Sequence, residues 1–220
     1  FCPEGQNKRS VWMKKYKHLV FDIDGTMIDS LPVHMVSLIK TLREITGREY
    51  TEEELKFTFG IPGDATMRQL GISDPDAAVE RWLDNLVEAG SKDIPLFPGI
   101  RELLEKLQEK GVHLGIVTSK MRSEYIAQFT ANGLLPFFDN VVTADDTPKG
   151  KPDPAPMFAY MKMTGAAPEE ILFFGDTVYD MDCARGAGVD HALVLWGCLC
   201  PDEIEATYKL EKVEDILDFV

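Results

Sequence analysis

Short apolar runs alternate with amphipathic helical patterns through the C-terminal part of the chain, and this alternation constrains the fold more than any other feature. Apolar residues recur every three to four positions from Ile100 to Leu107 and predict a helix that ends near Gly111. Further helices are predicted at residues 123–132, 155–164 and 180–186, and strands at 19–21, 112–117, 138–143, 171–174 and 192–195. Strands that alternate with helices pair in parallel and are covered on both faces. We therefore expect an α/β fold with a Rossmann-like, doubly wound parallel sheet.

The segment between the first and second predicted strands has only helical patterns. A stripe of apolar residues predicts one helix from 31 to 45, and further helices are predicted to begin at Thr51 and to cover 64–70 and 75–89. This segment is predicted to be an all-helical insert. We expect an N-terminal extension at 1–15, in which 1–12 precede a natural start near Met13, an α/β core made of 16–30 and 96–220, and a helical domain at 31–95.

The charge balance of the chain restricts its partners. Asp and Glu number 37 against 23 Lys and Arg, and the net charge is −14. Such a charge argues against binding to nucleic acid or to an anionic membrane surface. No apolar run approaches the length of a membrane span, and the four cysteines have neither zinc-site nor disulfide-framework spacing. We expect a cytoplasmic monomer or homodimer, in which an anionic substrate would need a local cluster of cations.

Two aspartates follow the first predicted strand directly, in the stretch Asp22-Ile23-Asp24-Gly25. Ligands of open parallel α/β sheets bind just beyond the carboxyl ends of the strands. Side chains two residues apart on a regular strand lie on the same face but are separated along it, so a curl after Asp22 would bring both carboxylates into one small space. Gly25 provides the conformational freedom for such a turn. Alone, this pattern also fits a solvated acidic turn.

Three later segments of the chain also carry polar residues that could take part in chemistry. Thr118 and Ser119 end the second strand, where hydroxyls and free amides can hold phosphate oxygens or cap a helix. Lys151 lies in the string Gly-Lys-Pro-Asp-Pro. Asp176 and Asp180 are four residues apart after an apolar strand, a spacing that turns both carboxylates to one side if a helix begins there.

Together these four segments, in this order, resemble the four motifs of the haloacid dehalogenase-like superfamily of phosphohydrolases. The resemblance covers residues 16 to about 197, and the helical insert lies where that family places a C1-type cap domain. The branch that looks nearest contains phosphoglycolate phosphatases and β-phosphoglucomutases.

The resemblance implies roles for the acidic residues. Asp22 is expected to attack phosphorus and form an aspartyl-phosphate, and Asp24 to act as general acid and then general base. Mg²⁺ is expected to bind Asp22, the backbone carbonyl of Asp24, and Asp176. Asp180 is expected to support this site or to bind the metal through water, although a helix cap explains it about as well.

The resemblance also implies which residues bind the substrate. Thr118, with Ser119, and Lys151 are expected to hold the phosphoryl oxygens, and Lys151 is preferred over Lys149 because it lies in the motif. In the insert, the loop at 60–63 and the cation of Arg68 are the candidate contacts to the leaving group, although a solvated helix residue is the commoner explanation of such an arginine.

The function implied is a Mg²⁺-dependent phosphatase that hydrolyses a small phosphorylated metabolite, phosphoglycolate-like or a sugar phosphate. The first alternative is a phosphomutase of the β-phosphoglucomutase kind. Those mutases carry an arginine in the cap loop where this chain has Gly63, which weakens that alternative. A non-catalytic phosphate-binding or regulatory module is a further alternative, and it is disfavoured because every chemical residue is present.

Overall fold

The computed structural model describes residues 15–58, 61, 63–90 and 94–220. The predicted extension at 1–15 therefore lies outside the described residues except for Lys15, and the predicted loop at 60–63 is described only at Ile61 and Gly63. Among the helices of these ranges, none combines the length and the apolar character needed to cross a bilayer.

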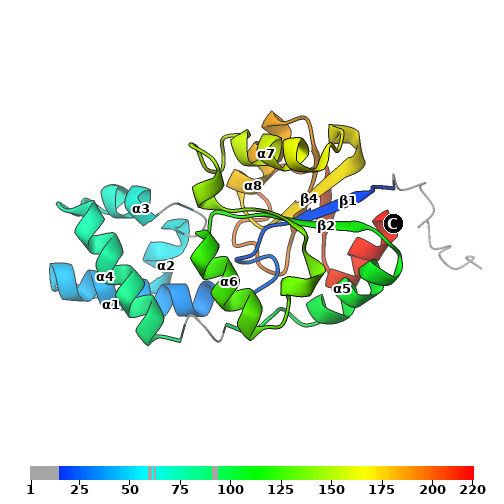
Figure 1. Cartoon of the computed structure of the whole chain (residues 1–220). Coiled ribbons are helices and arrows are strands. Elements are labelled where there is room, and N and C mark those ends of the chain that lie inside the picture. Colours follow the sequence, from blue (N-terminus) through cyan, green and yellow to red (C-terminus); the bar gives the residue numbers. More distant parts are fainter. Residues whose placement is uncertain (1–14, 59–60, 62, 91–93) are drawn as a thin grey trace, which may run out of the picture.

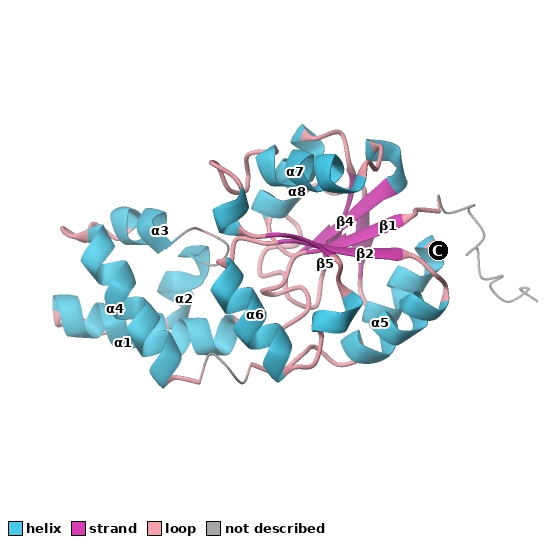
Figure 2. Ribbon diagram, in the orientation of Figure 1, coloured by secondary structure: helices cyan, strands magenta, loops and turns pink. Residues whose placement is uncertain are grey.

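The centre of the molecule is a six-stranded sheet in which all neighbouring strands are parallel (Figure 2). The strand order is β3-β2-β1-β4-β5-β6, so the order reverses beside β1. The strands are β1 (His18–Phe21), β2 (His113–Val117), β3 (Asn140–Val142), β4 (Ile171–Gly175), β5 (Asp190–Val194) and β6 (Tyr208–Leu210). The predicted α/β fold with a doubly wound parallel sheet is confirmed.

Helices cover both faces of this sheet (Figure 1). Both faces need cover because the strands carry apolar side chains on each of them. In β1, Leu19 and Phe21 belong to one apolar cluster, and Val20 belongs to another on the opposite face. The first cluster contains side chains of α5 and α6, and the second contains side chains of α7 and α8. These helices are α5 (Ile100–Glu109), α6 (Arg122–Ala131), α7 (Ala155–Thr164) and α8 (Val178–Gly186).

The insert is helical, as predicted, and has an apolar core of its own. Its helices are α1 (Leu31–Thr46), α2 (Glu52–Leu55), α3 (Gly63–Gln69) and α4 (Pro75–Glu88). The buried side chains between them include Leu38, Leu42 and Trp82. Two polar contacts fix α4 on α1: the Trp82 indole N–H donates to Ser37 Oγ at 2.9 Å, and Asn85 donates to Thr41 Oγ1 at 2.8 Å.

The two connections between insert and core run side by side. The Asp29 amide donates to the Pro95 carbonyl at 2.9 Å, and the Phe97 amide donates to the Met27 carbonyl at 3.0 Å. Two adjacent connections and a separate apolar core support the proposed division into a core of 16–30 and 96–220 and a helical domain of 31–95.

The sequence pattern missed the last part of the fold. Strand β6 and the 3-10 helix η5 (Val213–Phe219) were not predicted, because a three-residue strand and a short 3-10 segment carry no detectable periodicity. The other 3-10 segments are η1 (Lys56–Thr58), η2 (Leu135–Phe137), η3 (Ala144–Asp146) and η4 (Pro168–Glu170). The Phe138 amide donates to the Leu135 carbonyl and closes η2, so β3 begins at Asn140 rather than at the predicted 138.

Candidate active site

The carboxyl ends of β1, β2 and β4 meet where the strand order reverses. This is the position at which doubly wound sheets bind their ligands. Asp22 follows β1, Thr118 follows β2 and Asp176 follows β4. Asp22, Thr118 and Lys151 line the same cavity between the sheet and the helical insert.

The turn after β1 brings both aspartates of the first motif to this cavity. The carbonyl of Ile23 accepts hydrogen bonds from the amides of Thr26, Met27 and Ile28 at 2.8–3.3 Å, so the chain curls directly after Asp22. As a result Asp22 and Asp24 both line the cavity. The chain therefore has the curl after Asp22 that would bring both carboxylates together.

Two glycines let the acidic residues approach the backbone closely. Gly25 has a φ of +71°, and a Cβ built on it would lie 2.1 Å from Asp176 Oδ2. A Cβ on Gly175 would lie 2.3 Å from the Cβ of Asp180. Any side chain at either position would displace an acidic residue of the site.

We expect Gly25→Ala to lower activity by at least about 10²-fold, since a displacement of about 1 Å in a catalytic group can cost that much. The left-handed backbone and the clash with Asp176 both disfavour alanine. Gly47→Ala is the matched control, because Gly47 has a φ of +70° but nothing lies within 4 Å of its added Cβ. Comparing kcat and melting temperature of the two variants separates backbone strain from damage to the site. Equal losses of activity in both variants would contradict this account.

Three buried carboxylates form a cluster that could hold a metal ion. One oxygen from each of Asp22, Asp176 and Asp180 lies within 4.8 Å of the others. Thr26 Oγ1 donates to Asp176 Oδ1 at 3.1 Å. Asp176 Oδ2 is buried and accepts no hydrogen bond from the described residues. Buried polar atoms nearly always have a partner, so this carboxylate oxygen is a candidate ligand for a bound ion.

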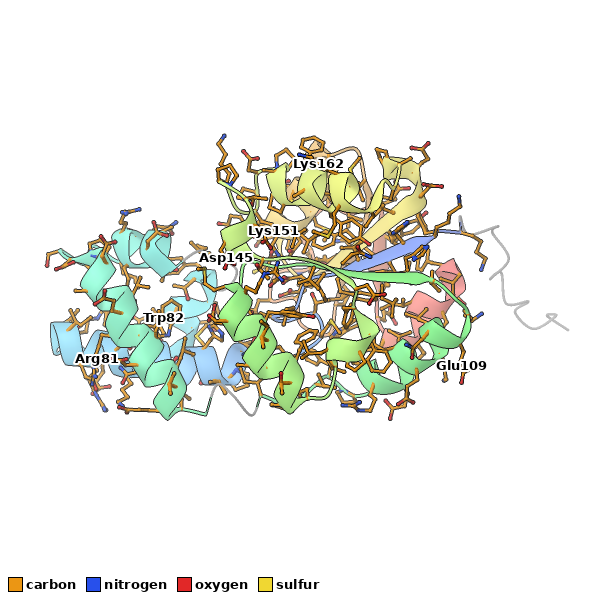
Figure 3. The ribbon with its side chains drawn as sticks, viewed as in Figure 1. Arg81, Trp82, Glu109, Asp145, Lys151 and Lys162 are labelled. Carbon is orange, nitrogen blue, oxygen red and sulfur yellow. The ribbon has the colours of Figure 1, made fainter. Side chains whose placement is uncertain are left out.

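Lys151 is the cation of this cluster. Its ammonium lies 2.9 Å from Asp22 Oδ1 and 2.5 Å from Asp180 Oδ1, and its side chain is 5% exposed. Asp180 is fixed at its second oxygen, which accepts from the Thr177 amide at 3.0 Å and the Thr177 hydroxyl at 2.6 Å. Asp180 thus caps α8 and also belongs to the carboxylate cluster, so a helix cap and a place in the candidate metal site are both consistent with its position. Lys151 lies on the side of the core that faces the insert (Figure 3).

Burial and crowding of charge shift the pKa values of these groups. Burial raises the pKa of Asp22 to about 6, against the opposing effect of Lys151. Burial and the neighbouring carboxylates of Asp180 and Asp22 raise the pKa of Asp176 well above its usual value. Burial alone would lower the pKa of Lys151, but Asp180 and Asp22 outweigh it and hold that pKa above its usual value. When all three carboxylates are ionised, they exceed the single ammonium of Lys151 by two negative charges.

Asp24 has a different environment. Its Oδ2 lies 2.8 Å from the ammonium of Lys120, and its Oδ1 lies 3.9 Å from Nε2 of His34. Burial would raise the pKa of Asp24, but Lys120 and His34 outweigh it, and the pKa lies below its usual value. The sequence analysis gave Lys120 no role, although its place directly after Thr118-Ser119 at a strand end was the available signal.

The other predicted residues divide into those that reach the cavity and those that do not. Thr118 is buried, Ser119 is exposed, and both line the cavity. Lys149 is 71% exposed and pairs with Asp153 at 3.1 Å, so it does not replace Lys151. Arg68 is 61% exposed on α3, pairs with Asp64 of the same helix at 2.6 Å and is not among the residues that line the cavity.

Comparison with known proteins assigns the chain to a class of hydrolases. Residues 19–194 match the haloacid dehalogenase-like hydrolase family, and the chain belongs to that family. It is therefore an enzyme, and the family resemblance expected from the four motifs is confirmed.

Individual relatives are similar over most of the chain. The chain is 30% identical over 202 residues to the pyrophosphatase PpaX of Oceanobacillus iheyensis, covering 92% of this chain and 94% of the relative. It is 30% identical over 190 residues to the phosphoglycolate phosphatase of Pseudomonas syringae pv. tomato, covering 82% and 70%. A crystal structure from Lactobacillus plantarum, of a protein provisionally named a phosphoglycolate phosphatase, superposes with a TM-score of 0.86 at 32% identity, covering 94% of this chain and 100% of that one.

Proposed function

We propose that the protein is a Mg²⁺-dependent phosphatase that hydrolyses a small phosphorylated metabolite through an aspartyl-phosphate on Asp22. The observation that carries this proposal is the buried contact of Asp22 with Lys151 inside an acidic cluster at the carboxyl end of the sheet. The similar proteins named as a pyrophosphatase and a phosphoglycolate phosphatase support hydrolysis of a phosphate bond as the reaction. The insert at 31–95 is proposed to act as a cap over the site.

The residues present suit a divalent cation. When the three carboxylates are ionised, two negative charges remain after Lys151 is counted, and Asp176 Oδ2 lacks a partner among the described residues. Mg²⁺ prefers carboxylate oxygens, and three of them converge here within 4.8 Å of one another. Asp22, Asp176 and Asp180 would hold the ion, and the backbone carbonyl of Asp24 remains a proposed ligand. When bound, Mg²⁺ would supply positive charge to the phosphoryl oxygens.

The chain's own groups account for binding and attack. The Thr118 and Ser119 hydroxyls and the Lys151 ammonium would hold the phosphoryl oxygens and set the phosphorus in line with Asp22. An oxygen of Asp22 would form a bond to phosphorus while the bond to the leaving oxygen breaks. Lys151 would also reduce repulsion between the Asp22 carboxylate and the incoming dianion.

Asp24 would move the proton in both steps. The ion pair with Lys120 keeps Asp24 ionised, which suits the base that takes a proton from the attacking water in the second step. To protonate the leaving oxygen in the first step, Asp24 would carry a proton on Oδ1, which has no hydrogen-bond partner among the described residues, while Oδ2 stays beside Lys120.

A phosphomutase remains the alternative on the same scaffold. The position at which β-phosphoglucomutases carry arginine is Gly63 here, and a Cβ built on Gly63 would lie 3.3 Å from Val79 Cγ2 and 3.5 Å from the Trp82 ring. A long side chain would therefore need these residues to move. This favours the phosphatase.

Mg²⁺ is expected to raise the melting temperature by roughly 5–10 °C at pH 7.5 and by much less at pH 5. An ion at about 100 times its dissociation constant stabilises by about 2.7 kcal/mol, and 1 kcal/mol corresponds to about 2–4 °C in a chain of this size. Protons compete for Asp22 and Asp176, whose pKa values are raised, so the stabilisation is present above about pH 6 and is lost as the pH falls through that value. Thermal scans at both pH values test this, with Asp176→Asn as the variant that should lose the shift. An equal shift in that variant would place the ion elsewhere.

The experiment that tests the function is phosphate release from a panel of metabolite phosphates, with and without Mg²⁺. Turnover that requires Mg²⁺ supports the proposal. Isomerisation of a sugar phosphate with little free phosphate would support the mutase instead, and no reaction with any compound would support a binding module.

A further inference from the structure

The cavity over Asp22 has two chemically different sides. The core side is polar and holds the catalytic groups, whereas the side formed by the insert is apolar. We call the second side the apolar wall, which consists of six side chains from α1 and α4: Met35, Leu38, Val79, Trp82, Leu83 and Leu86. Figure 3 shows Trp82 within the insert and Lys151 on the core.

The cations that line the cavity are engaged by the core carboxylates. Among the described lining residues only Lys151, Lys120 and a histidine can carry positive charge. Lys151 contacts Asp22 at 2.9 Å, and Lys120 contacts Asp24 at 2.8 Å. The histidine, His34, has its Nε2 3.9 Å from Asp24. Each of the three therefore faces an acidic group of the reaction centre.

Among the described residues that line the cavity, no further cation is available to a second negative group on the substrate. The loop sequence at 58–63 contains no charged residue. Glu124, at the start of α6, adds a further carboxylate to the cavity lining. A carboxylate or a second phosphate on the leaving group would thus lie between apolar side chains and Glu124, where an anion is strongly disfavoured.

We propose that the leaving group of the substrate is an uncharged alcohol with an apolar portion that packs on the apolar wall. This inference rests on the proposed function, because it takes the phosphoryl group to lie at Asp22. Neutral, partly apolar phosphomonoesters are therefore expected to be better substrates than phosphoglycolate or pyrophosphate.

The size of the cavity limits this alcohol. The volume is about 240 Å³, whereas an apolar cavity of about 150 Å³ can hold a benzene molecule. A phosphoryl group and one small apolar group, such as a four-carbon chain or a single ring, fill such a space. Larger leaving groups, such as nucleosides, would have to extend out of it.

The direct test compares kcat/KM for four substrates with Mg²⁺: butyl phosphate, glycerol phosphate, phosphoglycolate and pyrophosphate. We expect kcat/KM for butyl phosphate to exceed the values for phosphoglycolate and pyrophosphate by roughly tenfold or more. The apolar wall fits the butyl chain but would leave the extra charge of the other two compounds unpaired, and such a difference discriminates at least that strongly. Preference for phosphoglycolate or pyrophosphate would overturn this inference and leave the phosphatase proposal intact. No turnover of any of the four, or of the wider panel, would overturn the phosphatase proposal itself.

A charge placed on the apolar wall provides the second test. Leu83 lines the cavity and is 46% exposed, so Leu83→Lys should fold. It should lower kcat/KM for butyl phosphate and raise it for phosphoglycolate, changing their ratio by about tenfold or more. The matched control is Val87→Lys, one helical turn further along α4, 59% exposed and outside the lining of the cavity. An unchanged ratio in Leu83→Lys, or the same change in Val87→Lys, would overturn the assignment of the apolar wall to the leaving group.

Discussion

Replacing Asp22 by asparagine is expected to lower phosphate release by about 10⁴-fold or more, the loss typical of removing a nucleophile. A carboxamide has nearly the shape of the carboxylate but cannot form the aspartyl-phosphate. The measurement is kcat with Mg²⁺ on the best substrate of the panel.

The same variant should not be unfolded. Because burial raises the pKa of Asp22 to about 6, its ionised form is unfavourable in the folded metal-free protein at neutral pH. The neutral asparagine should therefore leave the melting temperature of the metal-free protein equal or higher, and Lys151 keeps its contact with Asp180. Turnover that survives the substitution in a folded protein would mean that another group attacks phosphorus.

Replacing Lys151 by methionine is expected to lower both activity and stability. The variant leaves Asp22 and Asp180 buried without their common cation, and removing one partner of a buried ion pair typically costs about 3–5 kcal/mol. Lys151 is proposed to hold the phosphoryl oxygens, so its loss should lower kcat/KM by about 10²–10³-fold. The melting temperature and kcat/KM, both with Mg²⁺, check this prediction.

Lys149→Met is the matched control for Lys151. Lys149 is two residues away, 71% exposed and paired only with Asp153 among the described residues. Exposed pairs of this kind contribute about 0–1 kcal/mol, so we expect stability and activity close to those of the unchanged protein. A comparable loss in the Lys149 variant would contradict the assignment of the phosphoryl-binding lysine.

Most of the fold was predictable because the core elements bury apolar residues with a clear period. The run that contains Leu19, Val20 and Phe21 is buried on both faces of the sheet, and this makes a continuous apolar strand easy to detect. By contrast, η5 is held by long-range packing of residues such as Phe219, which lies against Tyr16 and Tyr208. Contacts between the two ends of a chain leave no local pattern.

The candidate site was predictable where motif residues follow strands. Asp22, Asp176 and Thr118 follow strand ends that the parallel sheet places together. Contacts that depend on side-chain directions across elements were not predictable. Lys120 pairs with Asp24 only because β2 lies beside β1, and Arg68 points to Asp64 on its own helix rather than to the cavity.

The most direct test of the central claim is to look for the phosphoryl group on Asp22. Protein mixed with substrate and Mg²⁺ is quenched in acid within the first turnovers, digested, and mapped by mass spectrometry. The account predicts one phosphorylated aspartate, Asp22, which forms at least as fast as phosphate is released. With a phosphate ester whose leaving group departs without a proton, it accumulates further in Asp24→Asn, because only the base for hydrolysis is then missing. Steady turnover without a phosphorylated peptide in either protein, or with the phosphoryl group on another residue, would contradict the account.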